Sequence, residues 1–494
     1  MTEWRKHSIA SIVGKKRGAI LAQADNNVEA PSHVVGIGAS AGGLKAIEAF
    51  FEAMPADTSL AFVLVQHLSP DHKSMMQEIL SKRTPLQVIR AEQGMKVAAN
   101  CVYLIPPRKN LTIFHNELVL SEQDHNHGLN LPIDVFLRSL ADDLGPKAIA
   151  IILSGTGSDG MRGIRAVKET GGLVLVQDEE SADFDGMPRA AISTGLADFI
   201  LPPEEMPQQL LAYLNHPLAV SDGTSGILLS DEDNLTRIFS ILRDKTKVDF
   251  TFYKPSTVVR RIERRMTVNQ VNDLGEYTAF LERSPHEVNT LHRELLIGVT
   301  NFFRDSGAWE YLETKVLPEL FANCNDDLLR VWVPGCSTGE EAYSLAIMLE
   351  EYRVNNNHEN MKIKVFATDI DRDSILFASN GIYPESIAAD IDGPLLAKYF
   401  MARGETFQVS RQIRESIVFA QHNLIRDPPF TRISFVSCRN LLIYLQQVLQ
   451  TKVISLFNFS LLAGGILFLG TSETTGECSD LFEALHHKWK VFRS

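Results

Sequence analysis

The sequence has few cysteines, and their positions argue against two classes of site. Its 494 residues include five cysteines, which form no CxxC pair and no regular spacing. Disulfide frameworks and structural zinc sites both depend on such spacings. We therefore expect no metal, and a reducing cytoplasm is the location that this composition favours.

Long apolar runs are also missing. The first twenty residues are basic but contain no continuous apolar core, so they do not resemble a secretory signal. The uncharged run 453–472 is interrupted by Asn458 and by the pair Gly464 and Gly465, where a helix would pass into a strand. We therefore expect this run to be buried in a water-soluble fold and not to span a membrane.

Positive charge is in the minority. The formal net charge is −13, which argues against general affinity for nucleic acid because an acidic protein is repelled by a polyanion. A hydrophobic content of 45% with 22% charged residues is typical of a globular protein. At roughly 100 to 200 residues per domain, a chain of this length is expected to hold about three folding units.

The order of apolar segments predicts an α/β chain. From residue 33 to about residue 214, short apolar strands alternate with helical patterns, which predicts a doubly wound parallel sheet. The next part is helical, and a Rossmann-like alternation follows, with a short antiparallel insertion at 400–418; no internal repeat is found. The predicted division is a tail at 1–32, an α/β domain at 33–216, a linker at 217–229, a helical domain at 230–300 and a second α/β domain at 301–494.

The first Gly-rich turn predicts a serine nucleophile. The sequence GASAGG at 38–43 follows an apolar strand and places Ser40 in a GxSxG spacing at a helix N-terminus. His67 ends the next strand, and Asp159 lies in a glycine-rich loop after a later strand. The carboxyl ends of parallel strands share one edge of the sheet. Because a serine needs a base and an orienting carboxylate to attack at neutral pH, these residues predict a hydrolase site.

Each part of this site also has a more ordinary interpretation. Gly36, Gly38 and Ala41 fit a relaxed dinucleotide fingerprint, GxGxxA. That fingerprint needs an acidic residue near the end of the next strand, where His67 stands instead. Alone, His67 would be a common strand-end residue and Asp159 a turn former. Their shared sheet edge favours the catalytic interpretation.

The second Gly-rich turn, VPGCSTGEE at 333–341, predicts a different ligand. Its glycines let the backbone approach a nucleoside, and the next strand ends in Asp369 and Asp371, which can accept hydrogen bonds from a ribose. The turn lacks GK[ST], which argues against a triphosphate. Glu341 would repel phosphate but suits a sulfonium, so S-adenosylmethionine is the predicted cofactor. Taken alone, this glutamate would be a favourable charge in the first turn of a helix.

The N-terminal α/β region resembles the catalytic domain of the chemotaxis methylesterases, which hydrolyse methyl-glutamate esters on receptors. The resemblance rests on IGASAGG, VQHLSP, VYLIPP, LSGTGSDGMRG and GMPRAAI, which span most of residues 33–200. It implies that Ser40 is the nucleophile, His67 the general base and later acid, and Asp159 the orienting carboxylate. The chain departs from the family pattern at Ala41, where threonine is common, and in GTGSDG, where GMGNDG is common. The family's receiver domain is not expected before residue 33.

Residues 230–494 resemble the chemotaxis receptor glutamate methyltransferases. The resemblance rests on GVTNFFRD, the second Gly-rich turn, AQHNLIRDPPF and FVSCRNLLIYL, with Gly298 where the family usually has asparagine. It implies that Tyr444 lies near the transferred methyl group. The residues that it implies for the cofactor cleft are Thr300, Arg304, Glu341, Asp369, Asn423, Leu424, Cys438, Arg439 and Asn440.

A basic helix is predicted in KPSTVVRRIERRM. Arg260 lies four residues before Arg264, and Arg261 lies four residues before Arg265. Like charges at this spacing oppose helix formation unless a partner relieves them. The methyltransferase resemblance implies that the four arginines bind acidic receptor helices, and a solvated face of a small domain is the alternative.

Together, the two resemblances predict a bifunctional enzyme that methylates receptor glutamates and hydrolyses their methyl esters. Deamidation of glutamine is a second reaction open to the esterase site, because both hydrolyses pass through an acyl-enzyme. The expected partners are methyl-accepting chemotaxis receptors. Two alternatives stay open: a signalling scaffold in which one or both folds are catalytically silent, and a general serine hydrolase that acts on small esters.

Overall fold

The computed structural model describes residues 29–67, 75–123, 129–220, 231–296, 298–324 and 328–494. The predicted tail and linker therefore lie largely outside the described residues. Within these ranges, no helix is both long enough and apolar enough to cross a bilayer.

Seven parallel strands form the first large sheet, in the order β10-β9-β8-β1-β2-β5-β3. The strands are β1 (His33–Ala39), β2 (Leu60–Gln66), β3 (Gln87–Arg90), β5 (Cys101–Leu104), β8 (Ala148–Ile152), β9 (Leu173–Gln177) and β10 (Phe199–Leu201). The central strands are apolar and buried on both faces, as helix-covered parallel sheets require. The predicted doubly wound sheet is confirmed.

Helices cover both faces of this sheet. Phe50 and Leu210 belong to the core on one face, and Leu137 and Ile164 to the core on the other. The helices of the first face are α1 (Gly43–Glu52), α2 (Met76–Leu80) and α6 (Met206–Leu214). Those of the second face are α3 (Pro132–Leu144), α4 (Met161–Glu169) and α5 (Gly186–Ser193). A small antiparallel sheet of β4 (Met95–Lys96), β6 (Lys109–Phe114) and β7 (Glu117–Glu122) packs beside α3.

The next part is a helical bundle, as predicted. After the short α7 (Pro217–Val220), its helices are α9 (Glu232–Thr246), α10 (Pro255–Val268), α11 (Leu274–Arg283) and α12 (Pro285–Leu295). The side chains of Asp231, Asp273 and Ser284 accept hydrogen bonds from backbone N–H groups in the first turns of α9, α11 and α12. Such caps satisfy N–H groups that a helix start leaves free.

The second large sheet has the order β16-β12-β11-β17-β18-β20-β19. Its strands are β11 (Leu328–Pro334), β12 (Lys362–Asp369), β16 (Ile417–Gln421), β17 (Ile433–Cys438), β18 (Leu461–Leu469), β19 (Glu483–His486) and β20 (Val491–Arg493). The first five in spatial order pair in parallel, whereas β20 pairs antiparallel with β18 and β19. This arrangement confirms the predicted Rossmann-like sheet.

The helices around this sheet are α13 (Ser306–Tyr311), α14 (Leu317–Ala322), α15 (Glu340–Asn355), α16 (Arg372–Asn380), α17 (Gly393–Tyr399) and α19 (Gln447–Ser460). The uncharged run predicted to pass from helix to strand does so, because α19 ends where β18 begins.

The antiparallel insertion predicted at 400–418 is present in its first half. Strands β13 (Ile382–Pro384), β14 (Phe400–Arg403) and β15 (Thr406–Val409) pair antiparallel in the order β13-β15-β14. The remainder of the predicted range differs, because α18 (Arg411–Ser416) buries Ile413 and the main sheet resumes with β16.

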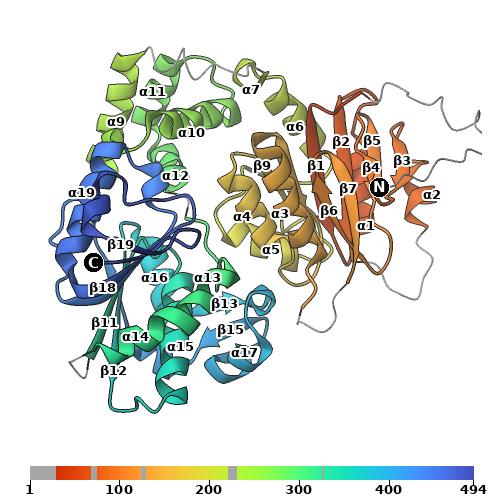
Figure 1. The fold of residues 1–494 in the computed structure, drawn as a ribbon. Coiled ribbons are helices and arrows are strands. Elements are labelled where there is room, and N and C mark those ends of the chain that lie inside the picture. The colour runs from red at the N-terminus through yellow and green to blue at the C-terminus, as the bar shows by residue number, and fades with distance from the viewer. Residues whose placement is uncertain (1–28, 68–74, 124–128, 221–230, 297, 325–327) are drawn as a thin grey trace, which may run out of the picture.

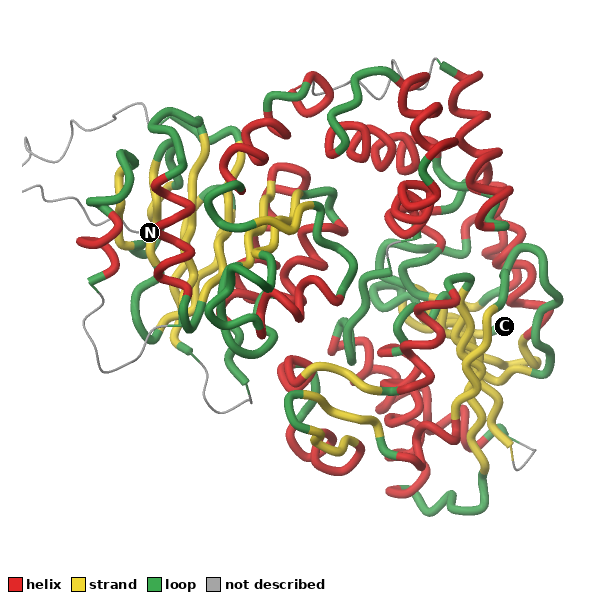
Figure 2. Tube along the Cα trace, turned by 180° about the vertical axis from the view of Figure 1, so that it is seen from behind, coloured by secondary structure: helices red, strands yellow, loops and turns green. Residues whose placement is uncertain are grey.

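The helical bundle lies against both α/β parts of the molecule (Figure 1), and the view from behind shows the same arrangement (Figure 2). Helices α3, α4 and α5 of the N-terminal part face the C-terminal part (Figure 1). On α4, Arg162 contacts Asp390 and donates to the carbonyl of Ser386 at 3.3 Å. Lys168, near the other end of α4, pairs with Glu294 of α12 at 3.1 Å. The helix α4 therefore contacts both following parts of the chain.

Candidate active sites

Ser40 stands directly after β1, three residues before α1 begins at Gly43. The turn between them needs a left-handed backbone at Gly42, whose φ is 69°. A Cβ at this glycine would lie 2.7 Å from the Cβ of Asp183, so a larger residue would not fit. The hydroxyl Oγ of Ser40 lies 3.1 Å from Nδ1 of His67, which directly follows β2.

Asp159 completes a line of hydrogen bonds. Its Oδ2 lies 2.8 Å from Nε2 of His67. The carboxylate is 2% exposed and also accepts the backbone N–H groups of Ile133, Asp134 and Gly160. When Nε2 of His67 donates to Asp159, Nδ1 is left to accept the proton of Ser40. The three residues follow β1, β2 and β8, which are neighbours in the sheet.

Asp134, in the first turn of α3, is a buried acid beside this line that the sequence did not single out. Burial and the charge of Asp159 raise its pKa to about 7. Its Oδ1 accepts the backbone N–H of Gly163 at 2.6 Å, whereas Oδ2 has no hydrogen-bond partner among the described residues. A first-turn aspartate is a common helix feature, so no local sequence signal would have separated it from the others.

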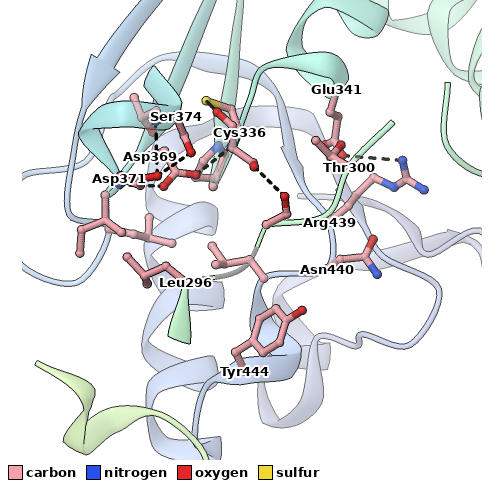
Figure 3. Close-up of a pocket in the computed structure, with 18 of the residues that line it drawn as sticks. Leu296, Thr300, Cys336, Glu341, Asp369, Asp371, Ser374, Arg439, Asn440 and Tyr444 are labelled. Carbon is pink, nitrogen blue, oxygen red and sulfur yellow. Dashed lines mark hydrogen bonds and ion pairs between the residues drawn. The ribbon is translucent and has the colours of Figure 1, made fainter. Parts of the chain in front are cut away.

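The second Gly-rich turn forms one wall of a pocket at the carboxyl ends of β11, β12 and β17 (Figure 3). The pocket holds about 1200 Å³ of space, including its open mouth. A Cβ at Gly335, where φ is 69°, would lie 3.0 Å from the side chain of Leu441. Glycine is therefore the residue that lets the backbone of the turn pack this closely against Leu441. A pocket at the carboxyl edge of a parallel sheet is where such folds bind nucleoside ligands.

Asp369 fixes the shape of this wall. Its Oδ2 accepts the backbone N–H of Ser337 at 2.8 Å, and its Oδ1 accepts that of Asp371 at 2.9 Å (Figure 3). Burial raises the pKa of Asp369, and the two backbone donors counteract this effect. The carboxylate therefore ties the end of β12 to the turn after β11 while facing the pocket.

Arg439 brings a buried cation to the opposite wall. Its guanidinium pairs with Asp305, lies 3.7 Å from Oε2 of Glu341 and stands 4.7 Å from the ring centre of Phe468. Glu341 is held in turn by the hydroxyl of Ser437 at 2.6 Å. Among the described residues, Nε and Nη1 of Arg439 have no hydrogen-bond partner. Buried donors of this kind are suited to a polar ligand group.

Family models match three consecutive parts of the chain. They are CheB methylesterase at residues 35–210, the all-alpha domain of CheR methyltransferase at 233–296 and the SAM binding domain of CheR methyltransferase at 298–491. A chemotaxis protein methyltransferase of Borreliella burgdorferi is 30% identical over 251 residues, which are 49% of this chain and 88% of that protein. The chain belongs to the CheR methyltransferase family. It carries a CheB methylesterase domain in front of the CheR domains.

Other relatives cover this fusion to different extents. An uncharacterized 104.1 kDa protein of Rhodobacter capsulatus is 40% identical over 443 residues, which are 85% of this chain but 46% of that protein. The chain thus spans about half the length of that relative. A protein-glutamate methylesterase/protein-glutamine glutaminase of Moorella thermoacetica is 34% identical over 37% of this chain and 44% of its own. The crystal structure of the Thermotoga maritima CheB methylesterase catalytic domain is 31% identical, covers 36% of this chain and 97% of its own, and has a TM-score of 0.34.

The CheR pocket brings together nearly all the residues predicted for it. Those that line it are Thr300, Arg304, Glu341, Asp369, Asn423, Leu424, Arg439, Asn440 and Tyr444. Cys438 is the exception, because the side chain at the end of β17 is fully buried and does not line the pocket. Burial at the end of an inner strand therefore corrects the prediction for Cys438.

Several residues of the CheR pocket were missed. The backbone N–H of Ser337 donates to Asp369. Ser337 belongs to the second Gly-rich turn, so that motif could have indicated it as a pocket residue. Tyr253 reaches the pocket from the helical domain, and Glu169 reaches it from the CheB domain. Neither has a local signal, because their place depends on how the domains pack. Glu473 accepts the backbone N–H groups of Asn440, at 3.0 Å, and Leu442, at 2.7 Å, and so holds the segment that leads to Tyr444.

The basic helix is mostly buried, whereas both interpretations given for its four arginines require exposed side chains. Arg260 is exposed, but Arg261, Arg264 and Arg265 are 4%, 5% and 7% exposed. Arg264 pairs with Asp198 and Glu294, and Arg265 pairs with Glu287 at 2.6 Å. The partners that relieve the stacked charges therefore lie within the chain. The prediction that these three arginines bind acidic receptor helices is wrong for this arrangement, whereas that for Arg260 stays a prediction.

Proposed function

We propose that this chain methylates glutamate side chains of methyl-accepting chemotaxis receptors and hydrolyses the resulting methyl esters. The observation that carries the proposal is the presence of two assembled sites in one chain, a Ser40–His67–Asp159 line and a separate CheR pocket. We also propose a cytoplasmic location and the domain division given above. A general serine hydrolase would leave the CheR pocket without a role.

In the esterase reaction, Oγ of Ser40 attacks the ester carbonyl while its proton passes to Nδ1 of His67. Asp159 stabilises the resulting imidazolium from the opposite nitrogen. His67 then gives the proton to the leaving methoxide, and methanol departs from an acyl-enzyme that water hydrolyses by the same steps. A glutamine side chain would form the same acyl-enzyme with ammonia as the leaving group, which supports deamidation as a second activity.

The CheR pocket suits S-adenosylmethionine, which supplies a methyl group on a sulfonium. Carboxylates at Glu341 and Asp369 complement a cationic, ribose-bearing ligand. Nε and Nη1 of Arg439, which have no hydrogen-bond partner in the described parts of the chain, suit its carboxylate. The other residues that would hold it are Thr300, Arg304, Asn423, Leu424 and Asn440.

Methyl transfer needs little else from the protein. The acceptor glutamate is ionised at neutral pH, so its carboxylate attacks without a general base once it is held in line and shielded from water. We propose that Tyr444 lies beside this carboxylate and orients it.

The test is incubation with methyl-labelled S-adenosylmethionine and membranes that contain candidate receptors, following protein-bound label and volatile methanol together. We expect label on receptor glutamates and its later release as methanol. Ser40→Ala is expected to stop methanol release alone, and Asp369→Ala to stop labelling alone. The proposal fails if Ser40→Ala releases methanol at the wild-type rate or if no receptor acquires label. A chain that binds S-adenosylmethionine and receptor without turnover would support the scaffold alternative.

A further inference from the structure

The CheB domain contributes an acidic side chain to the CheR pocket. Glu169 is the last residue of α4, and it lines both this pocket and a neighbouring crevice between the two domains. The pocket and the crevice share Glu169, Val299, Thr300 and Arg304. This side of the pocket therefore opens toward the CheB domain.

The carboxylate of Glu169 faces residues of the proposed methyl-transfer site. Its Oε1 lies 3.9 Å from Nη2 of Arg304, and each of the two side chains is 28% exposed. Burial raises the pKa of Glu169, while the charges of Arg304 and Arg261 oppose this effect. Glu169 and Tyr444 line the same pocket, and burial together with the charge of Glu169 raises the pKa of Tyr444. A glutamate and an arginine that lie 3.9 Å apart thus share one pocket with the tyrosine proposed to orient the acceptor.

The helix that presents Glu169 is fixed at its C-terminal end. Arg261 donates at 3.0 Å to the carbonyls of both Lys168 and Glu169, and Arg264 donates at 3.0 Å to that of Gly172. Cations at free carbonyls are favourable at a helix C-terminus. Arg261 and Arg264 were predicted to bind an acidic helix of a receptor. In the structure they instead bind the carbonyl groups at the C-terminal end of α4.

The other end of α4 is fixed by the CheR domain. Arg162 pairs with Asp390, and the side chains are 13% and 10% exposed. Arg165, one turn further on, lies 3.9 Å from Glu340 of α15. The contacts at its two ends therefore hold α4 in the interface between the CheB domain and the CheR domains.

We propose that α4 is an internal occupant of the acceptor side of the CheR pocket, with Glu169 in the place of the acceptor glutamate. The inference rests on the proposed function. Because Glu169 and Arg304 already share this space, a receptor glutamate reaches Tyr444 only when the CheB domain moves away. The arrangement described is then closed to external methylation.

The same movement would expose part of the esterase site. A Cβ at Gly157, in the loop that carries Asp159, would lie 3.2 Å from Oε1 of Glu385 in the CheR domain. The interface thus reaches from the CheR pocket to the loop of the esterase triad. Undocking changes the surroundings of both sites at once, which couples two opposed activities.

The experiment measures the initial rate of receptor methylation by the full chain at a receptor concentration below its KM. Glu169→Lys places a cation beside Arg304 and Arg261, and Asp390→Ala removes the partner of Arg162 without altering Glu169. The control is Glu204→Lys, the same charge change at an exposed position of the CheB domain. If the open state is the minor one, we expect both variants to raise the rate about tenfold or more through a lower receptor KM, and the control to leave it unchanged.

The outcomes separate the two proposals. If wild type methylates the receptor fragment and neither Glu169→Lys nor Asp390→Ala lowers the receptor KM, the internal-occupant inference is overturned and the proposed function stands. If wild type neither binds S-adenosylmethionine in calorimetry nor labels a receptor fragment, the proposed function fails. A methyl ester found on Glu169 by mass spectrometry, after incubation without receptor, would independently support its place at the acceptor position.

Discussion

Nε2 of His67 lies 2.8 Å from Oδ2 of Asp159, a carboxylate that three backbone N–H groups already hold in place. The imidazole is thus oriented by a group that cannot turn away, although 35% of its own side chain is exposed. Such an arrangement keeps Nδ1 of His67 toward Ser40 and leaves the hydroxyl accessible from solvent.

Asp159→Asn tests whether the charge of this residue matters for ester hydrolysis. An amide at this position can present N–H to His67 and so favours the wrong tautomer, and it no longer stabilises an imidazolium. We expect methanol release from a methylated receptor to fall by about 10⁴-fold. Receptor labelling by the CheR domain of the same variant is the control and should keep its wild-type rate. A loss of less than tenfold in methanol release would contradict the role given to Asp159.

Arg264→Met tests the buried ion cluster between the domains. Arg264 and Lys168 share Asp198 and Glu294, and the side chains of all four are no more than 5% exposed. Burial raises the pKa of Glu294, but Arg264 and Lys168 more than offset this and hold it below its usual range. Removing Arg264 leaves Asp198 with Lys168 alone and Glu294 with Lys168 and Arg265. The loss of one buried cation is expected to cost about 3 to 5 kcal/mol of unfolding free energy.

Arg260→Met is the matched control, because it makes the same chemical change on the same helix at an exposed position. Its expected effect on the unfolding free energy is within about 0.5 kcal/mol. Urea unfolding followed by circular dichroism would compare the two variants. Equal midpoints would show that the cluster contributes little to stability.

Asp369→Ala tests the wall of the CheR pocket. The change removes the acceptor of two backbone N–H groups, at Ser337 and Asp371, together with a proposed partner for the ribose. We expect the affinity for S-adenosylmethionine in calorimetry to fall by at least about tenfold, which corresponds to about 1.4 kcal/mol. Asp373→Asn, at an exposed position of α16, should bind like wild type. Unchanged affinity in Asp369→Ala would remove Asp369 from the cofactor site.

The sites could be predicted to the extent that strand ends determine them. Ser40, His67 and Asp159 each follow a strand of a parallel sheet, and parallel strands bring their carboxyl ends to one edge. Asp369 was predictable from the same rule. Cys438 also ends a strand, but the rule does not tell which strand-end side chain points into the core.

The contacts between domains could not be predicted. Helical periodicity places Arg261 and Arg265 on one face, but it does not reveal what covers that face. The partners of α10 are distant in sequence: Asp198 lies 66 residues before Arg264, and Glu294 lies 30 residues after it. Glu169 looks like an ordinary last-turn residue until the domains are packed together, and only then does it line the CheR pocket.

Asp134→Asn tests a pH dependence of stability. The pKa of Asp134 is raised to about 7 in the fold, from an ordinary value of 3.8. Between these two pH values the folded state therefore retains a proton that the unfolded state has lost. Stability from this group is therefore fully present below about pH 4 and is lost as pH rises through about 7, with a slope of at most about 1.4 kcal/mol per pH unit. Asparagine keeps the acceptor for the N–H of Gly163 and cannot ionise. We expect Asp134→Asn to be more stable than wild type at pH 8, and to gain less stability at pH 5, in urea unfolding.

Asp244→Asn, at an exposed position of α9, is the control for the chemical change. An equal gain at both pH values would show that Asp134 does not titrate in this window, and the raised pKa would then have no part in the stability of the loop that carries Asp159.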